Sequence, residues 1–218
     1  MAQTLALELL GFEHEPDVVG VEAVRIRTAS GVIHGRFHGA PAGNAAVIWV
    51  GGAGGGLHGP AGGMYARLAE QLAPEGVASL RLDYRRPNDL NPCVLDTLAG
   101  VAYLGTRERT RLALVGHSFG GAVVITAGAA TDRVVAVATL SSQTSGTSAV
   151  ESLSPRPLLL MHGQNDRVLP DSCSRDIFRR ARQPKEIRLY PGCGHGLDEC
   201  REQVDADLLA WVRRVLAG

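Results

Sequence analysis

A serine flanked by glycines, at the junction of an apolar strand and a helix of small residues, most constrains how this chain can fold. The run Leu112–Val115 is apolar and has the length of a buried strand, and Gly116-His117-Ser118-Phe119-Gly120-Gly121 follows it directly. Residues 122–130, rich in alanine, then predict a helix. A G-x-S-x-G turn between strand and helix presents the serine hydroxyl above a parallel sheet. The pattern predicts Ser118 as a nucleophile, provided that a base and an acid lie within reach.

The base and the acid are predicted downstream, each in a loop that follows a strand. The apolar run 157–161 indicates a buried strand, and Asp166 lies shortly after it. The alternating segment 187–190 indicates a last strand, and His195 lies in the glycine-rich loop beyond it. Serine, acid, histidine is the chain order that this chemistry takes when the serine sits in such a turn. All three side chains are expected at the carboxyl edge of a parallel sheet, where ligands bind in open α/β folds.

These motifs resemble those of the α/β-hydrolases, and among them the small dienelactone-hydrolase-like members that lack a lid. The resemblance rests on the elbow at Gly116–Gly121, the H-G-x-x-D-x-x-x-P run at His162–Pro170 and the G-x-G-H-G run at Gly192–Gly196. Together with a glycine loop after residue 50, these motifs span about residues 45–200. Dienelactone hydrolases proper carry cysteine as the nucleophile. Because this chain has Ser118 instead, their substrate does not carry over.

Backbone N–H groups that could stabilise an oxyanion are predicted at two places. Phe119 follows the serine at the positive, N-terminal end of a helix. A predicted strand also runs into the glycine loop Gly51–Gly56, where the resemblance places the second donor at Ala53, with Gly52 and Gly54 as near neighbours. The many glycines leave the register of this loop open.

The same glycine loop permits a second interpretation, a dinucleotide-binding fingerprint. Gly54-x-Gly56-x-x-Gly59 follows a strand and precedes a helix-like stretch, and the next strand ends at Asp83. Against this interpretation, Pro60 directly follows the last glycine, and two strand-like segments precede the unit. The fingerprint also leaves the downstream serine, acid and histidine unexplained. We therefore expect no nicotinamide or flavin, and no other cofactor.

Apolar runs alternate with helix-like stretches along most of the chain. Segments 21–28 and 32–37 predict an antiparallel hairpin. Further strands are predicted at 45–50, 77–83, 112–115, 134–140, 157–161 and 186–190, and helices at 61–73, 92–105, 119–130, 172–182 and 200–216. With the resemblance, this order predicts an α/β-hydrolase fold in a single domain of residues 1–218, a mostly parallel sheet of about eight strands covered by helices on both faces. The connection Ser141–Pro155 is too short for a cap domain.

Without a cap, the substrate pocket is expected to be shallow and open to water. Its walls are expected from the loops around the serine, namely Gly52, Gly54, His58, Tyr84, His117, Ser141 and Val168. Arg85, just beyond a strand, is a further candidate for the pocket lining. An open pocket favours short, soluble acyl groups, because affinity for an apolar chain scales with the area removed from water. A homodimer could supply the missing cover, and the sequence leaves the oligomeric state open.

Charge and cysteine usage narrow the class of protein further. The chain carries 22 basic and 22 acidic side chains, so its net charge gives no reason to expect binding to nucleic acid or to an anionic membrane. No apolar run is long enough to cross a bilayer, and the first residues lack the features of a secretory signal, so a cytoplasmic protein is expected. The cysteines at 93, 173, 193 and 200 are irregularly spaced and are expected as free thiols. Cys193, His195 and Cys200 lack a fourth zinc ligand with suitable spacing, so no metal site is expected.

The sequence predicts a serine hydrolase that cleaves carboxylic esters or related small acyl compounds through Ser118, His195 and Asp166. An acyltransferase or a thioesterase would use the same residues, and analysis of products would separate these activities. A non-catalytic binding protein with a hydrolase fold is the other alternative, because a fold does not guarantee an activity. A complete set of three catalytic side chains argues against that alternative.

Overall fold

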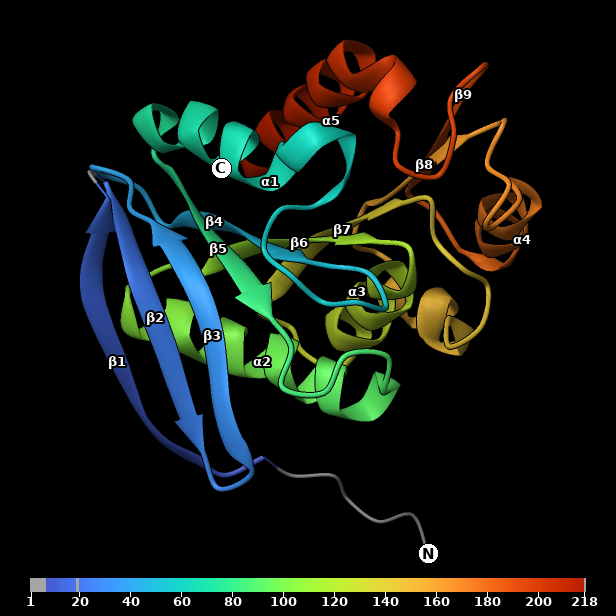
Figure 1. The fold of residues 1–218 in the computed structure, drawn as a ribbon. Coiled ribbons are helices and arrows are strands. Elements are labelled where there is room, and N and C mark those ends of the chain that lie inside the picture. The colour runs from blue at the N-terminus through green and yellow to red at the C-terminus, as the bar shows by residue number, and fades with distance from the viewer. Residues whose placement is uncertain (1–6, 19, 218) are drawn as a thin grey trace, which may run out of the picture.

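A single mixed sheet organises the protein (Figure 1). The computed structural model describes residues 7–18 and 20–217, and within them nine strands pair in the order β1-β2-β3-β5-β4-β6-β7-β8-β9. The pairs β1/β2, β2/β3 and β3/β5 are antiparallel, and the remaining pairs are parallel. The strands are β1 (Leu9–Val18), β2 (Val21–Thr28), β3 (Gly31–His38), β4 (Ala45–Val50), β5 (Val77–Asp83), β6 (Arg111–His117), β7 (Val134–Leu140), β8 (Leu158–Gly163) and β9 (Lys185–Tyr190).

Helices cover both faces of the parallel part of the sheet, which confirms the predicted layers. Helices α1 and α5 lie on one face, and α2 and α3 lie on the other (Figure 1). Helix α4 lies at the far end of the sheet, beside β8 and β9, and its Ile177 joins the core beneath α2 and α3. The helices are α1 (Pro60–Leu72), α2 (Leu90–Thr106), α3 (Phe119–Ala129), α4 (Ser172–Arg180) and α5 (Arg201–Leu216), with short 3-10 turns η1 (Ala73–Glu75), η2 (Ser148–Leu153) and η3 (Asp198–Cys200).

Strand β4 shows why the central strands are apolar on both sides. Every residue of its sequence AAVIWV is buried. Ile48 faces the core beneath α2 and α3, whereas its neighbour Trp49 faces the core beneath α1 and α5. A strand covered on both faces has no solvent side, so the alternation of apolar and polar residues disappears.

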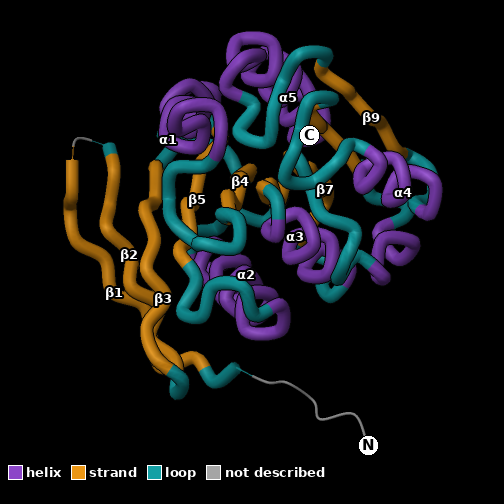
Figure 2. Tube along the Cα trace, turned by 45° about the vertical axis from the view of Figure 1, so that its right-hand side comes forward, coloured by secondary structure: helices purple, strands orange, loops and turns teal. Residues whose placement is uncertain are grey.

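Strand β1 is a ninth strand, in addition to the eight strand segments that the sequence predicted. It forms the exposed edge of the sheet, and most of its residues face solvent. Glu13 forms ion pairs with Arg25 and Arg27 of β2 across this edge. Charged side chains and a proline suit an edge strand but give no burial pattern that a sequence reading could detect. Figure 2 shows β1, β2 and β3 together at one side of the molecule, apart from most of the helices.

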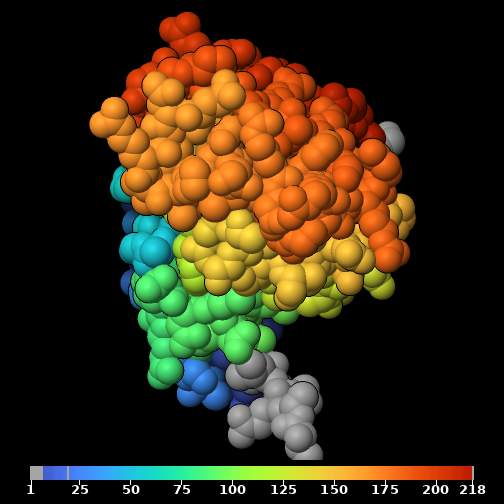
Figure 3. All heavy atoms as spheres, turned by 90° about the vertical axis from the view of Figure 1, so that its right-hand side faces the viewer, coloured from blue at the N-terminus to red at the C-terminus, as the bar shows by residue number. Residues whose placement is uncertain are grey.

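The connection between β7 and β8 holds no inserted domain, as predicted. In this part of the described chain the only regular element is the six-residue turn η2. In the space-filling view of Figure 3 the segment after β7, in yellow, lies between the green region around α2 and the orange region that contains α4. The carboxyl edge of the sheet is therefore not covered by a separate cap. Among the described helices, none has the combined length and apolarity needed to span a membrane.

Candidate active site

The elbow after β6 holds Ser118 in a strained backbone conformation, within a crowded turn that is rich in glycine. Ser118 has φ 57° and ψ −119°, a left-handed backbone that is costly for a residue with a side chain. A Cβ on Gly116 would lie 2.1 Å from the carbonyl oxygen of Gly120, and a Cβ on Gly120 would lie 2.3 Å from that of Gly51. The N–H of Ser118 donates to the carbonyl of Leu140 over 2.8 Å, which ties the elbow to the end of β7. Both flanking glycines are thus required for the turn.

Asp166 lies in the turn that follows β8, with its carboxylate fully buried. Its Oδ1 atom accepts hydrogen bonds from the backbone N–H groups of Val168 and Leu169, each over 2.8 Å. Burial alone would raise the pKa of Asp166. The bonds from Leu169, His195 and Val168 outweigh that effect and hold the pKa below its usual range. The carboxylate therefore stays ionised at neutral pH.

His195 joins Ser118 to Asp166. Its Nδ1 lies 2.7 Å from Asp166 Oδ2, and its Nε2 lies 3.1 Å from Ser118 Oγ. Because a buried carboxylate can only accept, Nδ1 carries the proton and Nε2 is left to accept one from the serine hydroxyl. The side chain of His195 remains 20% exposed, so the reacting atoms are reachable from solvent. The structure brings the three predicted side chains together from three separate loops at the carboxyl edge of the sheet.

The glycine loop after β4 packs directly against the elbow. A Cβ on Gly52 would lie 3.4 Å from the Cβ of Ser118. The turn is closed by a bond from the N–H of Gly55 to the carbonyl of Gly52, and Asp83 Oδ1 accepts from the N–H of Gly56. Ala53 lies on the exposed tip of this turn, next to Gly52. The sequence interpretation named Asp83 only within the alternative dinucleotide fingerprint, whereas in the structure its carboxylate fixes the glycine loop.

The residues predicted as pocket walls divide into accessible and buried groups. Gly54 and His58 are exposed, and Val168, two residues after Asp166, is 68% exposed. Tyr84 is buried instead, and its hydroxyl donates to the carbonyl of Gly51, so it supports the glycine loop from behind. Ser141 is completely buried, so its side chain does not line an open surface.

Arg85 also points away from the candidate site. Its guanidinium donates to Asp96 of α2 and to Thr28 of β2. The side chain of Asp96 is fully buried, and this pair links the end of β5 to α2. A buried, paired arginine is a structural contact, which corrects the expectation of a pocket residue.

His117 contacts His195 from the side. Its Nε2 lies 3.0 Å from the carbonyl oxygen of His195, and the two rings are 4.8 Å apart between centroids. Burial lowers the pKa of His117 to about 4, so it is neutral at pH 7 and donates this hydrogen bond. It therefore holds the loop that carries His195 without competing for the proton of Ser118.

A disulfide joins Cys193 to Cys200 and encloses the loop that carries His195. The sequence interpretation expected four free thiols, and this expectation is wrong for the pair. The turn η3 brings the chain back, so that the two Cα atoms lie 5.8 Å apart, within the range that a disulfide bridges. Cys93 and Cys173 are free, as predicted.

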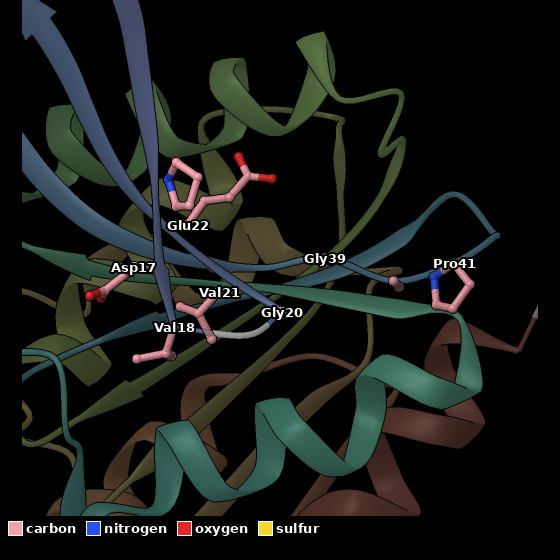
Figure 4. Close-up of a pocket in the computed structure, with 9 residues that line it drawn as sticks. Asp17, Val18, Gly20, Val21, Glu22, Gly39 and Pro41 are labelled. Carbon is pink, nitrogen blue, oxygen red and sulfur yellow. The ribbon is translucent and has the colours of Figure 1, made fainter.

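The hollow drawn in Figure 4 lies far from the triad in the sequence and in the sheet. It is formed where β1 and β2 meet and by the segment after β3. Its two acidic residues are engaged elsewhere, Asp17 with Arg36 and Glu22 with Arg107. In the described part of the chain no three His, Cys, Asp or Glu side chains gather as a metal ion would require.

The parallel sheet, the strained elbow and the Ser118-His195-Asp166 geometry together define an α/β-hydrolase. The chain belongs to the dienelactone hydrolase family, whose model matches residues 61–215.

Individual proteins are similar to this chain in sequence or in fold. The "Uncharacterized protein YfhR" of Escherichia coli (strain K12) is 32% identical over 108 residues, which cover 39% of this chain and 38% of YfhR. Dienelactone hydrolase from Anabaena variabilis superposes with a TM-score of 0.80 at 18% identity, over 94% of this chain and 99% of that one. Est1E from Butyrivibrio proteoclasticus superposes with a TM-score of 0.79 at 20% identity, over 90% of this chain and 99% of that one. At such identities the superpositions show the shared fold.

Proposed function

We propose that this protein is a serine hydrolase that cleaves carboxylic esters or related small acyl compounds. The observation that carries the proposal is the continuous contact from Ser118 Oγ to His195 Nε2 over 3.1 Å and from His195 Nδ1 to Asp166 Oδ2 over 2.7 Å. Its membership of a hydrolase family supports the same reaction class. The cysteine that dienelactone hydrolases proper use is replaced by Ser118, so a dienelactone is not proposed as the substrate.

In the proposed mechanism Ser118 attacks the substrate carbonyl while His195 Nε2 takes the hydroxyl proton. Asp166 keeps the imidazole in the required tautomer and stabilises the imidazolium that forms. The imidazolium then returns the proton to the leaving group, and an acyl-enzyme remains. Water, activated by the same His195, releases the acid and regenerates the serine.

The oxyanion of each tetrahedral intermediate is proposed to bind two backbone N–H groups. Phe119 offers one at the N-terminus of α3, where the helix dipole is positive. Ala53 offers the other, because Gly52 packs against Ser118 and the next peptide is on the same turn. Neither donor needs a side chain, which agrees with the small residues around the elbow.

The proposal is tested with Ser118→Ala. We expect the variant to lose labelling by a fluorophosphonate and to hydrolyse a chromogenic acetyl ester about ten-thousandfold more slowly, since the covalent route is removed while little packing changes. Ser145→Ala, at an exposed serine of the loop after β7, is the matched control and should keep both activities. Full esterase activity in a folded Ser118→Ala variant contradicts the proposal. Product analysis with added alcohols and thiols separates hydrolysis from acyl transfer.

A further inference from the structure

A buried histidine, His162, contacts Asp166 in addition to His195, and the proposed triad chemistry does not use it. His162, at the end of β8, is completely buried and has both ring nitrogens in contact with polar atoms. Its Nδ1 lies 2.7 Å from Ser174 Oγ in the first turns of α4. Its Nε2 lies 2.9 Å from the carbonyl oxygen of Leu169 and 3.2 Å from Asp166 Oδ2.

These contacts decide which nitrogen of His162 carries a proton. The carbonyl of Leu169 and the ionised carboxylate of Asp166 can only accept, so an unprotonated Nε2 would place three lone pairs against one another. Nε2 is therefore protonated and donates to Leu169. Nδ1 is then free to accept from the hydroxyl of Ser174, which is itself fully buried and has no other hydrogen-bond partner among the described residues. A hydroxyl that donates to Nδ1 stabilises this neutral tautomer.

The same contacts hold both ends of the turn from Asp166 to Leu169. Leu169 accepts from His162 with its carbonyl and donates to Asp166 Oδ1 with its N–H. Asp166 Oδ2 lies between Nε2 of His162 and Nδ1 of His195. Movement of His162 would therefore alter the conformation of this turn and the position of Asp166 Oδ2, the atom that orients His195.

We propose that Ser174 and His162 are positioning residues for Asp166, with the Ser174 hydroxyl holding the His162 proton on Nε2, against Leu169 and the carboxylate. This inference rests on the proposed serine hydrolase function. It extends the chain of contacts from Ser118, His195 and Asp166 to Ser174, a buried serine of α4. Ser174 takes no part in the covalent chemistry.

The arrangement also has a predictable effect on the pH profile. The positive end of the His162 N–H faces Asp166 Oδ2, so it stabilises the carboxylate charge and weakens its pull on the His195 imidazolium. Without that N–H, the imidazolium is held more strongly and the acidic limb of kcat/KM moves to higher pH. His117, from the end of β6, is a further titratable group beside these residues, and its Nε2 contacts the carbonyl oxygen of His195. On α4, Cys173 is free, while Asp171 and Arg175 pair with each other.

The test compares Ser174→Ala, His162→Leu and His162→Gln with Ser172→Ala, an exposed serine on the same helix, as the control. A short chromogenic ester is assayed from about pH 5 to pH 9. We expect Ser174→Ala to lower kcat about two- to tenfold with KM little changed, the scale of one hydrogen bond. His162→Leu should lower kcat about ten- to a hundredfold and move the acidic limb to higher pH, and His162→Gln, which keeps an N–H, should recover part of both losses.

Two outcomes overturn the inference. One is wild-type kcat and pH profile in Ser174→Ala and His162→Gln. The other is a loss that is equal in His162→Gln and His162→Leu with the acidic limb unmoved, which indicates packing alone. If His162→Leu does not fold, Ser174→Ala and His162→Gln still decide.

A readout that needs no activity separates this inference from the proposed function. In protein labelled with ¹⁵N-histidine, the signals of His162, identified by their absence in His162→Gln, should report a neutral ring protonated at Nε2. A ring protonated at Nδ1 overturns the inference even in an active enzyme. A wild-type protein without esterase activity or fluorophosphonate labelling contradicts the proposed function, whatever the tautomer.

Discussion

Ser118 shows how a single residue couples folding to chemistry. Its left-handed backbone costs free energy that the rest of the turn must offset. Gly116 and Gly120 allow the close approach of three chain segments, and the bond from Ser118 N–H to Leu140 closes the elbow. The result is a hydroxyl that points at His195 rather than into a helix.

Asp166 gives a prediction that links the site to stability. Because its pKa is lowered in the folded protein, its ionised form stabilises the fold at any pH above the pKa of the unfolded chain, about 4. That contribution is lost as the pH falls through the lower pKa of the folded state. We expect Asp166→Asn to be less stable than wild type at pH 7, and the difference in the free energy of unfolding to shrink below about pH 4.

Denaturant unfolding of both proteins at neutral and acidic pH measures this difference. Asp166→Asn also removes the partner of His195 Nδ1, so kcat at pH 7 should fall by about three to four orders of magnitude. A stability difference that grows as the pH falls would show that burial, which raises the pKa, outweighs the hydrogen bonds.

At the scale of elements, the central strands and the helices could be predicted from the sequence almost residue for residue. Strands β4, β5 and β7 have the predicted bounds, because their buried apolar runs are interrupted by clear turns. Strand β1 could not be predicted, because its stability comes from pairing at the edge and from cross-strand charges rather than from buried side chains.

The proximity of Ser118, His195 and Asp166 could be predicted for a related reason. Each of the three follows a recognisable strand, and the carboxyl ends of parallel strands meet at one edge. The contacts that support these three residues could not be predicted from the sequence. Ser174 and Asp83 reach the site from a helix and a strand whose local patterns carry no sign of it, and only the folded chain brings Cys200 back to Cys193.

The Cys193–Cys200 disulfide supports a prediction at this scale. It closes a short loop, with a sequence separation of 7, and His195 lies inside it. Loop-closure entropy gives such a link a contribution of about 2–3 kcal/mol, which corresponds to about 5–10 °C in Tm for a chain of this size. Reduction by a dithiol should therefore lower Tm and also lower kcat, because His195 gains freedom to leave Ser118 and Asp166.

Thermal melts and ester hydrolysis with and without the dithiol measure both effects. The double variant Cys193→Ala/Cys200→Ala is the control: it should resemble the reduced wild type and should not respond to the dithiol. A response in the double variant would assign the effect to the free thiols Cys93 and Cys173. Unchanged Tm and kcat in reduced wild type would show that other contacts alone fix the loop, such as the bond from Ala61 N–H to the carbonyl of Gly196.

At the scale of the whole molecule, the site lies at an uncovered edge between two cores. The cores beneath α1 and α5 and beneath α2 and α3 fix the sheet from both faces. The loops at its carboxyl edge are held by hydrogen bonds, while the connection after β7 adds no cap. A rigid sheet and an uncovered carboxyl edge are expected of an enzyme that takes small substrates from solution.

This openness predicts the preference for acyl length. Full burial of one methylene contributes about 0.8 kcal/mol, which would raise kcat/KM about fourfold for each carbon added to the acyl chain. Val168, which is 68% exposed and lies beside Asp166, can contact such a chain from one side only. We therefore expect kcat/KM for a series from acetyl to dodecanoyl esters to rise much less than fourfold per carbon and to level off early, without a jump at the solubility limit of the ester.

Assays across a range of enzyme concentrations, with the oligomeric state measured alongside, test whether a second copy covers the site. A steep rise that persists in the monomer would contradict the open pocket, whereas a steep rise that appears only with a dimer would place the missing wall on the partner.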